Sequence, residues 1–173
     1  MKKLKNLSID ILTEDKKWDK LSFSYKDVLE KTIRLALEDN KQFVDKFYNK
    51  EVEVSVVLTN DKSIQKLNKE YRNKDKPTNV LSFPMIEDFD NEVENELSLL
   101  NLISLGDIIL SYETILNESK EEKKSFKNHF IHLIIHSVLH LMGYYHETKN
   151  QAKAMENKEI ELLSGLGIQN SYL

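Results

Sequence analysis

The sequence predicts a single α+β domain over residues 1–173, in which a small mixed β-sheet is packed with helices. Segments with strand-like and helix-like patterns alternate irregularly along the chain, and neither an internal repeat nor a linker is visible. The 173 residues suit one domain, and a hydrophobic fraction of 40% is enough to form a core. With only 4 Gly and 2 Pro, long low-complexity segments are not expected.

The hydrophobic pattern predicts four strands and four helices. β-branched residues of alternating polarity indicate the strands, and apolar residues three or four positions apart indicate the helices. In chain order we expect a strand at 6–13, a helix at 24–48, a strand at 51–59, a helix capped by Asn60 or Asp61 that runs through Tyr71, strands at 80–84 and 105–111, a long histidine-bearing helix at about 118–143 and a last helix at about 148–164. The acidic segment 87–97 is expected to be a solvated loop.

The composition limits both the chemistry and the location of the protein. There is no cysteine, so any metal must be held by histidines and carboxylates, and this absence fits a reducing cytoplasm. No stretch approaches the ~20 apolar residues of a membrane span, and no signal peptide follows the basic N-terminus. We therefore expect a soluble, cytoplasmic protein. The net charge of -4 disfavours a general nucleic-acid coat protein but leaves room for a local basic groove.

The histidines form the clearest pattern in the chain. All 5 lie in one short window that begins at His129. At about 100° per residue of helix, His132, His136 and His140 form one stripe, and imidazoles four residues apart can bind one ion. Gly143 can end the helix in a left-handed conformation, which would bring His146 to the same ion. The pattern His136-x-x-x-His140-x-x-Gly143-x-x-His146 has the ligand spacing of the long metzincin zinc motif, so the fold is expected to be metalloprotease-like.

Three neutral imidazoles leave an open coordination position, which is typical of a catalytic zinc site, whereas a structural zinc normally has four protein ligands. We therefore expect one Zn²⁺ per chain at His136, His140 and His146, although nickel or copper could compete in vitro. His132 fits a group that supports the ligands or contacts substrate, but a core or surface role is equally compatible with its position. His129 is expected at the surface.

A second unusual segment lies at residues 61–76, where positive charge exceeds negative charge. Its basic residues are Lys62, Lys66, Lys69, Arg72, Lys74 and Lys76. Such a patch attracts phosphates, although a solvated helix face would have the same composition. Arg72 is one of very few arginines in a lysine-rich chain, and its planar fork can bind phosphate in a bidentate manner.

Three ordered segments and the tail of the chain together match one known family. The segments are 132–146, 67–84 and 105–108, and the similar tail contains Met155, Glu159, Leu163, Leu166-Gly167-Ile168 and Tyr172. In these segments the sequence resembles the YbeY family of bacterial endoribonucleases. The likeness covers most of the chain from about residue 52 onward, while the first 50 residues match only in general character.

The resemblance implies a metal-dependent endonuclease that prefers single-stranded RNA and acts on rRNA, especially at the 3′ end of the small-subunit rRNA, and in ribosome quality control. It implies RNA rather than DNA as substrate, and the small ribosomal subunit, a small-subunit ribosomal protein and an Era-type GTPase as partners. The family's metal ligands correspond to His136, His140 and His146, and its functionally important arginine corresponds to Arg72.

Two residues depart from the usual pattern of the family. Ser137 stands where Gly is common, which changes little, and Tyr145 stands where Asp is common, which removes a carboxylate that could orient a ligand. Ser137 also differs from metalloproteases with this ligand spacing, which carry a Glu there as general base. A serine hydroxyl cannot take a proton as a carboxylate can, so peptide hydrolysis is disfavoured.

We therefore expect RNA phosphodiester cleavage, by hydrolysis or transesterification, in a groove between the histidine helix and the Arg72 segment. Arg72 would bind the scissile phosphate and stabilise its developing charge. His132 is the nearest candidate for the general base. The RNA backbone would be guided by the neighbouring lysines, Lys66, Lys69, Lys74 and Lys76. Two alternatives remain open, namely a zinc metalloprotease-like hydrolase and a non-catalytic ribosome-assembly factor in which zinc only stabilises the fold.

Overall fold

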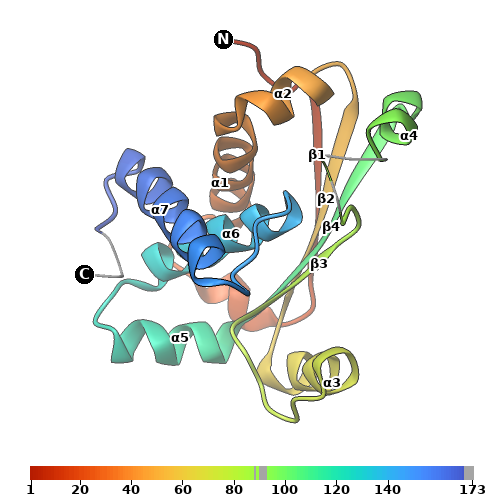
Figure 1. Cartoon of the computed structure of the whole chain (residues 1–173). Helices are drawn as coiled ribbons and strands as arrows, with labels where there is room; N and C mark the ends of the chain where they lie inside the picture. Colours follow the sequence, from red (N-terminus) through yellow and green to blue (C-terminus); the bar gives the residue numbers. More distant parts are fainter. Residues whose placement is uncertain (88, 90–92, 170–173) are drawn as a thin grey trace.

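The centre of the protein is a four-stranded mixed sheet with the order β1-β2-β4-β3 (Figure 1). The computed structural model describes residues 1–87, 89 and 93–169. β1, β2 and β4 run parallel, and β3 pairs antiparallel with β4. The strands are β1 (Asn6–Thr13), β2 (Glu51–Thr59), β3 (Val80–Pro84) and β4 (Leu102–Ser111). The predicted α+β class with a mixed sheet is therefore confirmed.

Helices cover the two faces of this sheet unequally. They are η1 (Lys16–Lys20), α1 (Tyr25–Asp39), α2 (Lys41–Phe47), α3 (Asp61–Arg72), α4 (Val93–Leu99), α5 (Tyr112–Glu121), α6 (Phe126–Leu141) and α7 (Lys149–Gly165). Figure 1 shows α1, α6 and α7 on one side of the sheet and α3 on the other. The histidine-bearing α6 contacts α1, α5, α7 and β3, and therefore lies at the centre of the helical layer.

The alternation of apolar residues along the strands explains this arrangement. Val52, Val54 and Val56 of β2 point into the main core beneath α1 and α6, and all three are 1% exposed. Residues of opposite parity, such as Ile109 of β4, form a small second cluster with Ile64 of α3. Because successive side chains of a strand point to opposite faces, one sheet can support both clusters.

Two predicted helices are each divided in the structure. The expected helix at 24–48 breaks at Asn40, whose side chain caps α2 by accepting a hydrogen bond from the backbone N–H of Phe43. The prediction of one helix at 118–143 is wrong as well, because two helices occupy this range. α5 ends at Glu121, and α6 begins only after Ser125. Lys123 adopts a φ of 55° in the intervening turn, and Ser125 caps α6.

Smaller differences occur near the acidic segment. β4 begins at Leu102 rather than at 105, because its pairing with β2 starts there. The predicted solvated loop at 87–97 is wrong from residue 93 onward, where α4 begins. The part of that loop at 88 and 90–92 lies outside the described residues.

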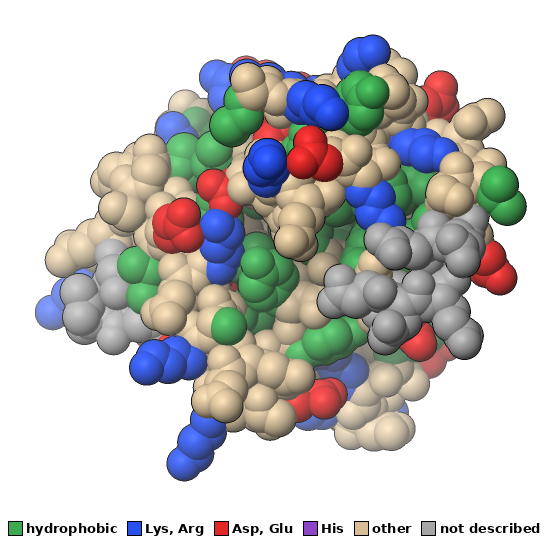
Figure 2. All heavy atoms as spheres, turned by 45° about the horizontal axis from the view of Figure 1, so that its top comes forward, with side chains coloured by type: hydrophobic (Ala, Val, Ile, Leu, Met, Phe, Trp, Pro, Cys, Tyr) green, Lys and Arg blue, Asp and Glu red, His purple; other side chains and the backbone are tan. Residues whose placement is uncertain are grey.

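The surface on the α2 side shows a mixture of basic and apolar side chains. Apolar side chains gather near the middle of the face drawn in Figure 2, with basic side chains (Lys or Arg) around them. Among the described residues, no histidine is visible on this face, so the histidine stripe of α6 opens elsewhere. The described part of the chain contains no helix that is both long and apolar enough to cross a membrane.

Candidate metal centre and its cavity

Helix α6 has one face that is only partly buried, and this face carries the histidines. Of the residues from Phe130 to Leu141, only His132, His136 and His140 are half-buried, while the others are buried in the core. Their four-residue spacing stacks them along the helix, as the sequence predicts. The apolar residues between them hold α6 against the sheet and so fix the direction of the three rings.

The three predicted ligands come together in space. One ligand nitrogen from each of His136, His140 and His146 lies within 4.8 Å of the others. The Nε2 atoms of His136 and His140 are 3.1 Å apart, and the ring centroids of His140 and His146 are 5.0 Å apart. Gly143 makes the return of the chain possible, because its φ of 92° lies in the region that favours glycine.

The protonation state of His140 suits a metal. Burial lowers the pKa of His140 to about 4, and the charges of His136, His146 and Arg72 add to the effect, while a backbone hydrogen bond acts against it. His140 is therefore neutral at pH 7, which is the form that binds metal. Three imidazole nitrogens with no thiolate fit Zn²⁺ and leave room for a further ligand.

Contacts behind the rings determine which nitrogen of each histidine faces the centre. The Nδ1 atom of His140 donates to the backbone oxygen of Tyr144 at 2.9 Å. The Nδ1 atom of His136 lies in hydrogen-bond contact with Oε1 of Glu159, whose second carboxylate oxygen lies 3.2 Å from Nε2 of His132. Both metal-facing nitrogens are therefore Nε2.

The sequence analysis did not identify Glu159 as a site residue. It is 0% exposed and lies on α7. The sequence does indicate that Glu159 is buried, because it lies on the same helix stripe as the apolar residues Met155, Leu162 and Leu163. An acid at a core position requires a buried partner, and histidines are the available ones.

The histidine cluster opens into a cavity of about 750 Å³. Its lining includes His132, His136, His140, His146 and Arg72. The prediction that the histidine helix and the Arg72 segment share a groove is thus supported by the geometry. His132 is 12% exposed at its side chain, so it borders the cavity without being free in it.

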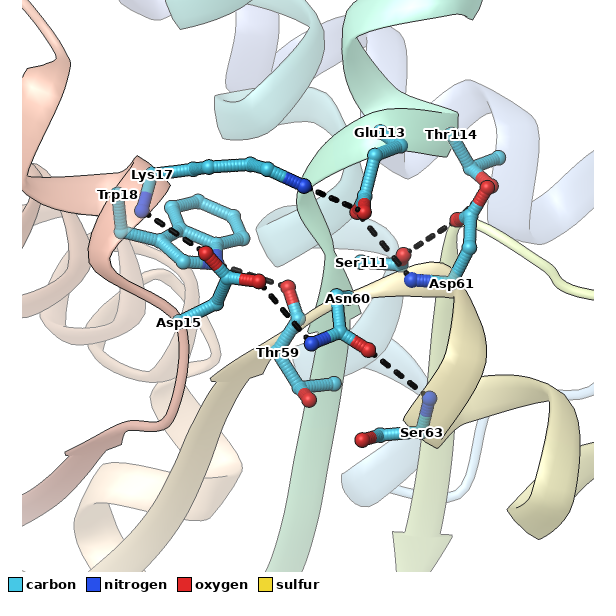
Figure 3. A network of polar contacts seen from close by, with 10 residues as sticks. All are labelled: Asp15, Lys17, Trp18, Thr59, Asn60, Asp61, Ser63, Ser111, Glu113 and Thr114. Carbon is cyan, nitrogen blue, oxygen red and sulfur yellow. Dashed lines mark hydrogen bonds and ion pairs between the residues drawn. The ribbon is translucent and has the colours of Figure 1, made fainter.

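Arg72 is placed at the cavity by a firmly anchored helix. At the start of α3, Asp61 accepts hydrogen bonds from the hydroxyls of Ser111 and Thr114, and Figure 3 shows this network where β2 and β4 end. At the other end, Asn73 takes a left-handed conformation with a φ of 56° and stops the helix directly after Arg72. Among the described residues, the exposed guanidinium of Arg72 has no hydrogen bond or ion pair, so it is available to a ligand.

The other end of the cavity holds a polar cluster. His129 was expected at the surface, but it is only 4% exposed, because its Nε2 lies 2.7 Å from the carboxylate of Glu118. The side-chain amide of Asn79 donates to the same carboxylate at 3.0 Å. Burial alone would raise the pKa of Glu118, but the two hydrogen bonds, together with the charges of His129 and Lys124, outweigh it and lower the pKa.

The predicted guiding lysines lie outside the cavity lining. Lys69 forms an ion pair with Asp75 at 2.8 Å, and Lys74 and Lys76 are exposed on the following loop. The lysines that line the cavity are Lys123 and Lys124, in the turn between α5 and α6. These two lysines were not predicted at the site, because the sequence pattern indicates one continuous helix through this turn.

The structure shows the surroundings of Ser137 and Tyr145, the two residues that depart from the family pattern. Ser137 is fully buried, its hydroxyl has no partner among the described residues, and it is not part of the cavity lining. The hydroxyl of Tyr145 donates to the backbone oxygen of Glu87 at 3.1 Å. The carboxylate that supports a ligand is therefore supplied by Glu159, not from position 145.

These features define a cluster of three histidines that could hold a metal ion, beside a cavity on an α+β fold. The family model described as Endoribonuclease YbeY matches residues 8–167. A curated relative, Endoribonuclease YbeY of Magnetococcus marinus, is 45% identical over 123 residues, which cover 70% of this chain and 84% of the relative. The chain therefore belongs to the YbeY endoribonuclease family.

A solved structure supports the fold independently. The solution structure of TM1509 from Thermotoga maritima superposes with a TM-score of 0.51 at 24% sequence identity, and the match covers 92% of both chains. At this level of identity the likeness concerns the fold alone.

Proposed function

We propose that this protein is a zinc-dependent endoribonuclease that cleaves single-stranded rRNA. The observation that carries the proposal is that His136, His140 and His146 line the same cavity as Arg72. The relative from Magnetococcus marinus bears the name endoribonuclease, which agrees with a phosphodiester as the substrate.

The residues of the cavity divide the chemistry between them. A zinc ion held by the three histidines would supply Lewis acidity at the phosphodiester. Arg72 would bind the scissile phosphate through its planar fork and stabilise negative charge as it develops. His132 borders the cavity one turn of α6 from His136, and we assign to it the proton transfer that cleavage requires.

Binding of the RNA backbone would be electrostatic. Lys123 and Lys124 can contact phosphates inside the cavity, and Lys69, Lys74 and Lys76 can attract the strand from outside it. The family resemblance extends the proposal to the 3′ end of the small-subunit rRNA, ribosome quality control and a cytoplasmic location. It further suggests a small-subunit ribosomal protein and an Era-type GTPase as partners.

The direct test of Arg72 uses the two arginines of the chain as a matched pair. Arg72→Ala and Arg34→Ala would be compared with the parent on an end-labelled single-stranded RNA and on the same RNA annealed to its complement. Arg72→Ala should reduce the cleavage rate by about 10²–10³-fold, because it removes a charged donor from the phosphate. Arg34 lies on α1 and pairs with Glu38, so its removal should leave the rate near that of the parent.

Zinc content is measured on the same samples. Equal zinc in all three proteins would assign the loss to phosphate binding and not to the metal. Cleavage by Arg72→Ala at the parental rate would refute this role of Arg72.

A further inference from the structure

We propose that Glu159 is a positioning residue that fixes His136 for the metal and holds His132 through the same carboxylate. The inference rests on the metal site proposed above and assigns a role to a residue that is not itself a ligand. It concerns a contact between α6 and α7, two helices that are separated by the loop carrying His146.

The contacts of Glu159 connect the two histidines. Its Oε1 atom is in hydrogen-bond contact with Nδ1 of His136, and its Oε2 atom lies 3.2 Å from Nε2 of His132. The two histidines lie one turn apart on α6, so one carboxylate reaches both. Glu159 is 0% exposed, so water cannot replace either partner.

The position of the carboxylate is set by the packing of α7. Met155, Leu162 and Leu163 bury this helix against the core. Lys158, directly before Glu159, forms ion pairs with Asp39 of α1 and with Glu161. These contacts fix the rotation of α7 and so aim Glu159 at α6.

The hydrogen bond selects the tautomer of His136. When the carboxylate of Glu159 accepts this hydrogen bond, Nδ1 of His136 carries the proton and Nε2 presents its lone pair. His140 receives the same tautomer from the backbone oxygen of Tyr144. One ligand therefore depends on a side chain that a substitution can remove, and the other depends on the main chain.

The first measurement is the zinc dissociation constant of metal-free protein, by competition with a chromophoric chelator. Glu159→Ala should weaken zinc binding about 10–100-fold, as removal of such supporting groups usually does. Glu159→Gln should weaken it less, because the amide oxygen can still accept from His136. Glu156→Gln, an exposed acid on the same helix, should bind within about twofold of the parent.

Thermal unfolding of the metal-free variants separates positioning from stability. If Glu159→Ala lowers the melting temperature but binds zinc as tightly as the parent, the residue is structural and the inference is wrong. A parent that binds no zinc would instead refute the metal site itself, and the inference with it.

The second measurement needs no metal and no RNA. Nitrogen-15 spectra of the imidazoles should show His136 of the metal-free parent with its proton on Nδ1. Glu159→Ala should shift His136 toward a mixture of tautomers and leave His140 unchanged. A parent with the His136 proton on Nε2, or a variant with unchanged His136 signals, would overturn the inference.

Discussion

Gly106 lies where β3, β4 and α6 meet. Replacing it with alanine tests whether the close packing at this junction is rigid. Its φ is 129°, and a Cβ built there would lie 2.1 Å from the backbone oxygen of Phe83 and 3.1 Å from Leu141. Gly106 pairs with Pro84 of β3. Gly106→Ala must therefore push β3 away from β4 by more than about 1 Å, because backbone cannot yield as a flexible side chain can.

The cost can be worked from two contributions. A residue other than glycine in this backbone region costs about 1–3 kcal/mol, and a displaced β3 loses the hydrogen bond from Met85 N to Leu105 O, worth about 0.5–1.5 kcal/mol. We expect a loss of about 1.5–4.5 kcal/mol in the free energy of unfolding, a large share of the usual total of about 5–15 kcal/mol. Leu141 is the neighbour of His140, so zinc affinity should fall as well.

Urea unfolding followed by tryptophan fluorescence measures this loss, since Trp18 is the only tryptophan and is 0% exposed. Gly165→Ala is the matched control, because nothing lies within 4 Å of its Cβ position at the end of α7. The free energy of unfolding of this control should rise by about 0.4–1 kcal/mol. A Gly106→Ala protein within about 0.5 kcal/mol of the parent would show that the junction is not rigid, against the reasoning above.

Two further predictions concern pH and salt. In the metal-free folded protein, the pKa of His140 is about 4, whereas its ordinary value of 6.5 applies to the unfolded chain. Between pH 6.5 and pH 4 the unfolded chain therefore binds this proton and the folded protein does not. The free energy of unfolding should fall as the pH drops through this range. Urea titrations should show a weaker fall for His140→Asn, and equal slopes would contradict the lowered pKa. Lys74→Ala and Lys76→Ala should weaken RNA binding uniformly across sequences and reduce the salt dependence of the binding constant. Fluorescence anisotropy at several salt concentrations measures both effects. An unchanged salt dependence would show that these lysines do not contact the RNA backbone.

The cluster of three histidines could be predicted because its geometry is local. His136 and His140 share one helix face, and Gly143 provides the return that brings His146 near. The strands could also be predicted from the sequence, because the alternation of Val52, Val54 and Val56 is visible in the local pattern of residues.

The residues that the sequence analysis missed act through partners far away in the chain. Glu159 reaches His136 across 23 positions, and Glu118 reaches His129 across a turn that was predicted as helix. Only the packing of α5 and α7 against α6 reveals these pairs. The break before α6 had a local signal in Ser125, whose capping role was overlooked because the charges before it also favour a helix.

Metal-dependent cleavage is tested by measuring zinc content and single-stranded RNA cleavage on the same preparations of the parent and of His136→Ala, with circular dichroism to verify the fold. We expect about one zinc per parent chain, and the loss of both zinc and cleavage in a folded variant. Cleavage that survives in zinc-free His136→Ala would contradict a metal-dependent mechanism, and so would a parent that is folded and active without metal.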